Sequence, residues 1–482
     1  MQCTNASDSA MIRASFAKLD YTPGTGEVVG SLWDDHKAEN VEWPLCARLA
    51  LFDGGGESAA LVLLDQAVLT APTALEFCKA VSAGANIPLT HIMAAPTHTH
   101  TSLRLRPYEP DDSVFERIDA IGQKLFTLAK ETSGRLQPVR LRYGCIDAPG
   151  WSFNRRPVYR APDGREQVGT HGPRGGKNFL RMEGPDEKEV AVLLATGADG
   201  EPVGGIVNFA CHPTTRYGAN AWSADFPGAL VQTLEDRYGG VFIYVNGACG
   251  DLSNVSGIPG KSSEIGIEHC SAMGKGLAEK VEEAIAPGRE CTAHQIRAAG
   301  ERVSIAQRRV TQGQLDAARE CLTALTRKEP WPKTLAWELY GYEYHFYAED
   351  AKKAEGLEHA EHLAREIIGM WEWQKRVGTR ELREDLEVQV IAIGDTAFVG
   401  FPAELFSAFG RELCSKSSFP ATFVVGLANG HVGYVPTLEA FEQGGHEVCL
   451  KMGTRLVPEA GRLLTEAALR ILARVREKEI EA

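Results

Sequence analysis

Residues 57–102 read ESAALVLLDQAVLTAPTALEFCKAVSAGANIPLTHIMAAPTHTHTS and decide the fold class. The apolar run at residues 59–64 predicts a buried strand that ends at Asp65. Residues 71–88 predict an amphipathic helix that Gly and Pro terminate. A second short apolar run follows and closes in a polar, histidine-rich loop. Strand–helix–strand alternation of this kind is typical of an α/β protein.

The same alternation extends outward in both directions. Residues 12–26 predict a strand that ends in a Pro-Gly turn at residues 22–24. Residues 188–215 predict two strands joined by the turn Asp199-Gly200. The further expected elements are a helix at 225–238, a strand from 241 that runs into a Gly-rich loop, a helix at 264–286, a hairpin around Gly394-Asp395 and a helix at 404–416. Residues 150–187 are rich in Gly, Pro and Arg and predict an irregular loop region.

A segment of different character interrupts this pattern from about Thr311 to Asp385. It is rich in Ala, Glu, Lys and Leu at helical spacing, and strands return directly after it. We therefore expect one α/β domain over residues 12–475 with a helical insertion at about 311–385 that covers the site. The alternative is an oligomer interface, which an aromatic cluster within the segment favours: Trp331, Trp337, Tyr340, Tyr342, Tyr344 and Phe346.

Charge and composition exclude several classes of protein. The 482 residues carry a net charge of −13, which is the wrong sign for a protein that neutralises nucleic-acid phosphates. No run approaches the roughly 20 apolar residues of a membrane span, and residues 1–11 lack the features of a signal peptide. The 11 cysteines are scattered without a CxxC pair, which favours reduced thiols. These features predict a cytoplasmic protein that acts on a small molecule, and they leave the oligomeric state open.

Two histidine motifs follow predicted strands. In THTHTS (97–102), an extended backbone would direct His98 and His100 to one face, and imidazole is a common zinc ligand. The simpler interpretation is a polar loop that happens to contain two histidines. In NFACHPTT (208–215), His212 stands where α/β proteins place their sites, although a single histidine there is more often satisfied within the core.

Three further motifs have equally simple structural interpretations. NGACGD (246–251) is either a loop that approaches a ligand or a tight turn. Glu404 of FPAE either binds a ligand or interacts with a helix dipole. Tyr434 of GLANGHVGYVPT (426–437) is most simply a core aromatic residue. Cys249 has no adjacent histidine in the sequence, so a thiol nucleophile is not favoured.

In their order along the chain, these motifs resemble the catalytic domain of the neutral/alkaline, non-lysosomal ceramidase family. The resemblance starts at DYTP (20–23), includes Asn154-Arg155 and SADFPG (223–228), and covers residues from about 12 to 472. It implies central β-sheets flanked by helices. It also implies a Zn²⁺ ion held by His98, His212, Glu404 and Tyr434, with His100 assisting the reaction and Arg155 holding the substrate.

Departures from the family pattern point away from ceramide. Gly247 stands where the ceramidases carry a serine, and His446 stands where they carry a second active-site tyrosine. His446 is either a second acid, a group that binds a polar substrate, or a neutral packing change. We also expect no counterpart of the family's C-terminal β-sandwich domain within these residues.

We therefore expect a zinc-dependent hydrolase in which a metal-bound hydroxide, formed because zinc lowers the pKa of water to roughly 7, cleaves an amide or ester bond of an N-acyl-type substrate other than ceramide. His100 would transfer the proton, and Arg155 would stabilise the oxyanion. Asp225 and Asp251 are candidates to orient the histidine ligands. The alternatives are a zinc-site glycoside hydrolase or lyase of carbohydrate metabolism, and a non-catalytic scaffold or binding protein that retains the fold.

Overall fold

The computed structural model describes residues 11–30, 35–105, 112–161, 164–176, 178–260, 264–327, 355–378 and 381–480. The aromatic cluster at residues 331–346 lies outside these ranges. Within them, no helix is both long enough and apolar enough to cross a bilayer.

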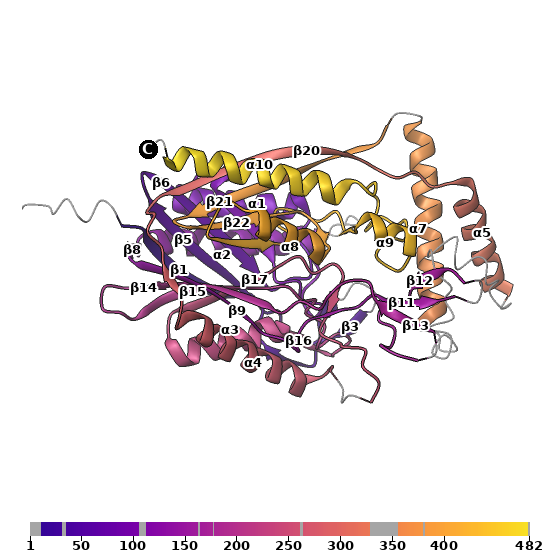
Figure 1. Cartoon of the computed structure of the whole chain (residues 1–482), viewed down its shortest axis with the longest axis horizontal. Coiled ribbons are helices and arrows are strands. Elements are labelled where there is room, and N and C mark those ends of the chain that lie inside the picture. Colours follow the sequence, from indigo (N-terminus) through magenta and orange to yellow (C-terminus); the bar gives the residue numbers. More distant parts are fainter. Residues whose placement is uncertain are drawn as a thin grey trace, which may run out of the picture.

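Three large sheets form the body of the molecule (Figure 1). The first has the order β7(Ile92–Pro96)-β6(Glu57–Leu64)-β5(Cys46–Gly54)-β1(Arg13–Asp20)-β8(Gln137–Pro138). The second has the order β17(Val241–Asn246)-β15(Pro202–Phe209)-β14(Glu189–Thr196)-β9(Arg140–Asp147)-β19(Arg289–Glu290). The third has the order β20(Ile296–Ala306)-β21(Arg383–Ile393)-β22(Thr396–Gly400)-β24(Ala421–Val425).

Each large sheet contains the same unit, an antiparallel pair followed by a helix and a parallel strand. The pairs β5–β6, β14–β15 and β21–β22 are antiparallel, whereas β7, β17 and β24 join them in parallel. The crossover helices are α1(Ala71–Ala85), α3(Asp225–Tyr238) and α8(Ser407–Lys416). A parallel neighbour requires such a crossover, because a tight turn can only reverse the chain.

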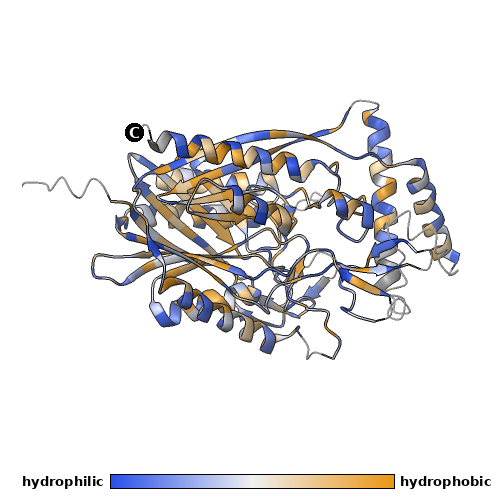
Figure 2. Ribbon diagram, viewed as in Figure 1, coloured by the Kyte–Doolittle hydropathy of each residue, from blue (hydrophilic) through white to orange (hydrophobic). Residues whose placement is uncertain are grey.

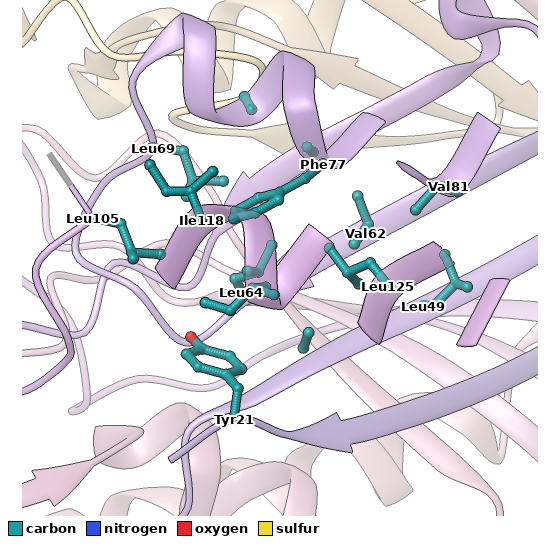
Figure 3. Close-up of a cluster of buried hydrophobic side chains, with 14 of the residues drawn as sticks. Tyr21, Leu49, Val62, Leu64, Leu69, Phe77, Val81, Leu105, Ile118 and Leu125 are labelled. Carbon is teal, nitrogen blue, oxygen red and sulfur yellow. The ribbon is translucent and has the colours of Figure 1, made fainter. Parts of the chain in front are cut away.

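The two faces of each sheet bury different residues. Alternate side chains from all three sheets meet in one shared core, to which Leu61, Ile206 and Phe398 belong. The opposite faces are covered by helices, with α1 and α2(Asp112–Ser133) on the first sheet, α3 and α4(Ile267–Ile285) on the second, and α8 and α10(Ala460–Ile480) on the third. Figure 3 shows the core beneath α1 and α2, and Figure 2 shows apolar strands beneath helices with polar outer surfaces. Mixed α/β architecture is therefore confirmed.

Short elements complete the chain and correct one expectation. Residues 150–187 are not simply irregular, because they contain β10(Phe153–Asn154), β11(Pro157–Arg160), β12(Glu166–Val168) and β13(Phe179–Met182). The remaining short elements are β2(Val28–Gly30), β3(Asp35–Lys37), β4(Asn40–Trp43), the 3₁₀ turn η2(Leu89–His91), β16(Ala221–Ser223), β18(Leu252–Ser253), β23(Glu404–Leu405), β25(Tyr434–Val435) and α9(Leu438–Gln443).

The inserted segment contributes two helices, α5(Gln312–Arg327) and α7(Glu355–Val377). They pack against each other at one end of the molecule (Figure 1) and form a core of their own that includes Leu315 and Ile367. Cys449 and Leu450, from the loop between α9 and α10, belong to the same core. The expected C-terminal limit of the insertion is slightly too late, because β21 already begins at Arg383.

Candidate metal centre

The four predicted ligands come from three separate parts of the fold and converge. His98 follows β7, His212 follows β15, Glu404 begins β23, and Tyr434 lies opposite Glu404 in the parallel pair β23–β25. Oε2 of Glu404 lies 3.2 Å from Nε2 of His212 and 3.5 Å from Nε2 of His98. The Tyr434 ring stacks on that of His212, with 6.4 Å between their centroids. The structure thus brings all four side chains to one place.

Backbone carbonyls fix the tautomers of the two histidines. Nδ1 of His98 lies 2.5 Å from the Ala67 carbonyl oxygen, and Nδ1 of His212 lies 2.8 Å from that of Cys249. A carbonyl oxygen only accepts, so each Nδ1 carries the proton and donates it. In this tautomer a neutral ring presents the lone pair of Nε2 toward Glu404, which is the state in which imidazole binds a metal.

The electrostatics of these groups fit a cation placed between them. Burial, reinforced by the Arg155 charge, lowers the pKa of His212 to about 4, so its Nε2 is unprotonated at neutral pH. Burial opposes ionisation of Glu404, but the neighbouring His212, His431 and His98 side chains hold the pKa of its carboxyl well below the usual range. Among the described residues, Nε2 of His98 has no hydrogen-bond partner. Lone pairs and a carboxylate that face one another in a buried site fit a divalent ion bound among them.

The local backbone differs from the extended segment that we expected. His98 adopts φ 74°, in the left-handed region that residues other than Gly, Asn and Asp rarely enter. The His98 and His100 rings nevertheless lie close together as predicted, with 4.9 Å between their centroids. The NH of His98 donates to Gln66 O at 2.8 Å, which helps to hold this turn. Strain of this kind is concentrated at functional sites.

Asp225 and Asp251 do not orient the histidines, so that prediction was wrong. Such a carboxylate would have to accept a hydrogen bond from Nδ1 of a histidine ligand, and both Nδ1 atoms already donate to the carbonyls of Ala67 and Cys249. Asp225 instead accepts from Thr215 and from the NH of Phe226 at the start of α3. Asp251 accepts from Asn154 and from Ser407, and thus ties β10 to α8.

Two residues that sequence analysis left without a role contact the site. Nε2 of His431 lies 2.9 Å from Oε1 of Glu404, so this ring fixes the carboxylate from the side away from the other histidines. Cys249 forms, with His98 and His212, a cluster whose ligand atoms all lie within 4.8 Å of one another. Burial raises the pKa of the Cys249 thiol well above its usual value, and Glu404 adds to the effect. His431 belongs to the same motif as Tyr434, so its position in the sequence was a usable signal.

Arg155 is committed to neighbouring protein groups. Its Nε donates to Oε1 of Glu447 at 2.9 Å, and its Nη2 donates to Gly250 O at 2.8 Å. Its guanidinium also lies 5.5 Å from the Tyr434 ring centroid. Burial and the Glu404 charge raise the pKa of Tyr434 well above 10, so its hydroxyl is protonated without a metal. Arg155 therefore orients Tyr434 and the Gly250 loop.

The predicted catalytic histidines lie on two sides of this centre. His100 is buried, 6.0 Å from the His212 ring centroid on one side and 6.0 Å from that of Tyr217 on the other. His446 is half-buried and meets the Tyr434 ring edge-on at 5.8 Å. Nζ of Lys451 lies 3.0 Å from Nε2 of His446. All seven predicted site residues are thus within one neighbourhood.

The NGACGD loop has glycines because neighbouring atoms exclude side chains. A Cβ at position 247 would stand 2.8 Å from Cβ of Ala210, and a Cβ at position 250 would stand 2.4 Å from Glu404 O. Gly250 also donates from its NH to Leu405 O, which joins this loop to β23. Close approach to the Glu404 segment therefore requires glycine at position 250.

Comparison with known proteins identifies the fold. No protein-family model matches the chain, and no curated protein matches it. Among solved structures, the neutral ceramidase from Pseudomonas aeruginosa matches with a TM-score of 0.66 and 19% identity, over 97% of this chain and 75% of that one. A structure of ceramidase complexed with C2 matches with a TM-score of 0.66 and 17% identity, over 97% of this chain and 76% of that one. The chain therefore has a neutral ceramidase-like fold.

Proposed function

We propose that this protein is a zinc-dependent hydrolase that cleaves an amide or ester bond of an N-acyl-type small substrate other than ceramide. The observation that carries the proposal is the convergence of the Nε2 atoms of His98 and His212 on the buried Glu404 carboxylate. The ceramidase-like fold supports an amide hydrolase in particular.

In this proposal His98, His212 and Glu404 hold the ion, and Tyr434 completes the set. Nitrogen and carboxylate donors of this kind suit zinc, and a catalytic zinc needs three protein ligands with a further position open. The ion would supply a Lewis acid and would lower the pKa of water in the site. Nδ1 protons held by the Ala67 and Cys249 carbonyls keep both imidazoles in the binding tautomer.

The chain's own residues supply the remaining chemistry. His100 accepts the proton of the attacking water on a ring nitrogen and returns it to the leaving nitrogen or oxygen. Arg155 keeps Tyr434 in place and brings a positive charge beside the carbonyl oxygen as that atom becomes negative. His431 keeps Glu404 from rotating, so the site is preorganised.

The surroundings of Gly247 support a substrate other than ceramide. The ceramidases that this sequence resembles carry a serine hydroxyl there. In this chain Ala210 fills the space that the Cβ of such a serine would need, at 2.8 Å. The site therefore works without that hydroxyl, and its substrate need not be the one that requires it.

Metal analysis tests the proposal most directly. Wild type, His98→Ala and Glu404→Ala would be purified without added metal and analysed by elemental mass spectrometry, with His294→Ala, at an exposed loop position, as the matched control. We expect one zinc per chain in wild type and in the control, and none in the two site variants. A well-folded wild type that holds no metal even after zinc is offered would contradict the proposal and favour a scaffold that retains the fold.

Substrate screening is the second step. Zinc-loaded wild type should hydrolyse members of a panel of N-acyl amino acids, N-acyl amino sugars and aryl esters, and His100→Gln should lower kcat by about 10²–10⁴-fold. Activity on aryl glycosides alone would instead favour the carbohydrate alternative.

A further inference from the structure

A buried lysine stands beside the metal centre without a carboxylate partner. Lys451 is only 6% exposed, and among the described residues no carboxylate oxygen lies within 4.0 Å of its Nζ. Its recorded polar contact is with His446, at 3.0 Å to Nε2 and 3.4 Å to Nδ1. An isolated buried ammonium costs several kcal/mol unless an anion accompanies it. The contrast is sharp with the nearby Arg155 and Arg156, which both pair with Glu447.

The position of Lys451 places this charge at the site. Its Nζ lies 5.6 Å from the Tyr434 ring centroid, and the His446 ring touches the same tyrosine edge-on. On the Lys451 side of the centre, Tyr434 and His446 are both partly exposed, whereas His98 and His212 are fully buried. A molecule that reaches Tyr434 from this side therefore meets the ammonium and the imidazole together.

The backbone around Lys451 is held from several directions. A tight turn returns the NH of Thr454 to Lys451 O at 2.9 Å, and Thr454 bridges to Gly433, the residue before Tyr434. Arg308 donates to Val448 O at 3.0 Å from outside the loop. The NH of His446 donates to Oγ1 of Thr170 at 3.2 Å. A cation fixed in this way has already lost its conformational entropy, as a preorganised binding group requires.

We propose that Lys451 and His446 form a subsite for a carboxylate group of the substrate, so that the substrate is an N-acyl amino acid or a similar N-acyl monoacid. This inference rests on the proposed hydrolase function. Lys451 donates one proton to an unprotonated nitrogen of His446, which leaves its other ammonium protons for the ligand. Glu366, Glu447 and Glu404 act on the Lys451 ammonium only from beyond ion-pair distance, so one ligand carboxylate can pair with it directly. A dianionic phosphate would instead leave excess negative charge beside the buried Glu447 and Glu404.

Ligand titrations of the metal-free protein test the subsite independently of the metal. Chelator-treated full-length protein would be titrated calorimetrically with N-benzoylglycine and with N-benzoylglycinamide, its uncharged counterpart. We expect wild type to bind the acid at least tenfold more tightly than the amide. Lys451→Met should abolish this preference, Lys451→Arg should retain it, and the exposed Lys416→Met should leave it unchanged. Circular dichroism of each variant would verify folding.

Several results would overturn the inference. Equal affinity for acid and amide in wild type, no binding of either probe, or a preference that survives in Lys451→Met would each contradict it. Tighter binding of inorganic phosphate than of N-benzoylglycine would show a phosphate site instead. If Lys451→Met lowered zinc affinity but kept the acid preference, the lysine would serve as a counterion for Tyr434. Because these titrations need no metal, they can fail while the zinc content stands, and a missing zinc leaves them interpretable.

Discussion

His98 and His212 direct their Nε2 atoms toward the candidate metal position. Cys249 and Glu404 both have a possible ligand atom close to these two nitrogens. The Cys249 thiol resists ionisation because it is buried near Glu404, and only the thiolate is a good ligand. Glu404 is ionised and fixed by His431. We therefore expect Cys249→Ser to retain one zinc per chain and Glu404→Gln to lose it, as measured by zinc titration with a chromophoric chelator. Loss of zinc in Cys249→Ser alone would identify the thiol as the third ligand.

Gly247 gives a prediction about packing. Its missing Cβ would collide with Cβ of Ala210, so Gly247→Ser should lower the free energy of unfolding by about 1–3 kcal/mol. Urea denaturation would measure this loss. The double variant Ala210→Gly/Gly247→Ser should recover part of the lost stability, since Ala210→Gly removes the Cβ with which the serine collides. A single variant as stable as wild type would mean that the loop moves aside freely.

His171 makes the protein sensitive to acid. Burial, together with the Arg155 charge, lowers its pKa to about 3, whereas an unfolded histidine titrates near 6.5. Between these values only the unfolded chain takes up the proton, so the stabilisation is complete above pH 6.5 and is lost as the pH falls toward 3.

The matching variant is His171→Asn, because asparagine tolerates the positive φ of 61° at this position. In urea unfolding of the metal-free protein, wild type should lose about 2 kcal/mol more than the variant between pH 7 and pH 5. Parallel pH profiles for the two proteins would show that His171 titrates normally.

The residues of the site were more predictable than their partners. The candidate ligands stand in short motifs at strand ends, and the order of these motifs along the chain identified His98, His212, Glu404 and Tyr434 as candidates. The Nδ1 acceptors could not be predicted, because Ala67 and Cys249 contribute backbone carbonyls that any residue type would offer. Lys451 was also missed, since a lone lysine in a loop gives no periodic signal, and only the fold places it beside Tyr434.

At the level of elements, the loop between α9 and α10 depends on one buried carboxylate. Glu447 accepts from Arg155, Arg156 and Thr170, which belong to the β10–β12 region. Glu447→Gln would leave two buried guanidinium groups without the negative charge that pairs with them. We therefore expect the free energy of unfolding, measured by urea denaturation, to fall by about 3–5 kcal/mol. Glu442→Gln, at an exposed position on α9, is the control and should change stability by less than about 0.5 kcal/mol. A Glu447→Gln variant as stable as that control would contradict this role.

Elements with strong periodicity were predicted closely, and short ones were not. The helix expected at 225–238 coincides with α3, and the Asp199-Gly200 turn joins β14 to β15 as predicted. The strands within residues 150–187 escaped detection because each is only two to four residues long, too short for an alternating pattern. β10 pairs with the distant β18, whereas β11 pairs with β12 and β13 inside the same segment.

For the whole molecule, the helical insertion is a second packing unit with a core of its own. Its core contains Ile367 and shares Cys449 and Leu450 with the loop that carries Lys451. Ile367→Ala should therefore destabilise α5, α7 and this loop locally by about 2–5 kcal/mol. Hydrogen exchange should become faster there and stay unchanged in β5 and β6. Uniformly faster exchange would show instead that the insertion unfolds only with the rest of the chain.

The candidate metal centre lies where three sheets meet, and this has a consequence for how the protein matures in the cell. His98 emerges early in synthesis, His212 comes midway, and Glu404 appears only when most of the chain has left the ribosome. No nascent fragment that ends before Tyr434 can present the complete predicted ligand set, so an ion bound by that set would be loaded only after this residue is made. A bound ion would then favour the finished molecule over truncated products by mass action. Retention of zinc during purification would accordingly report that the chain has been completed and correctly folded.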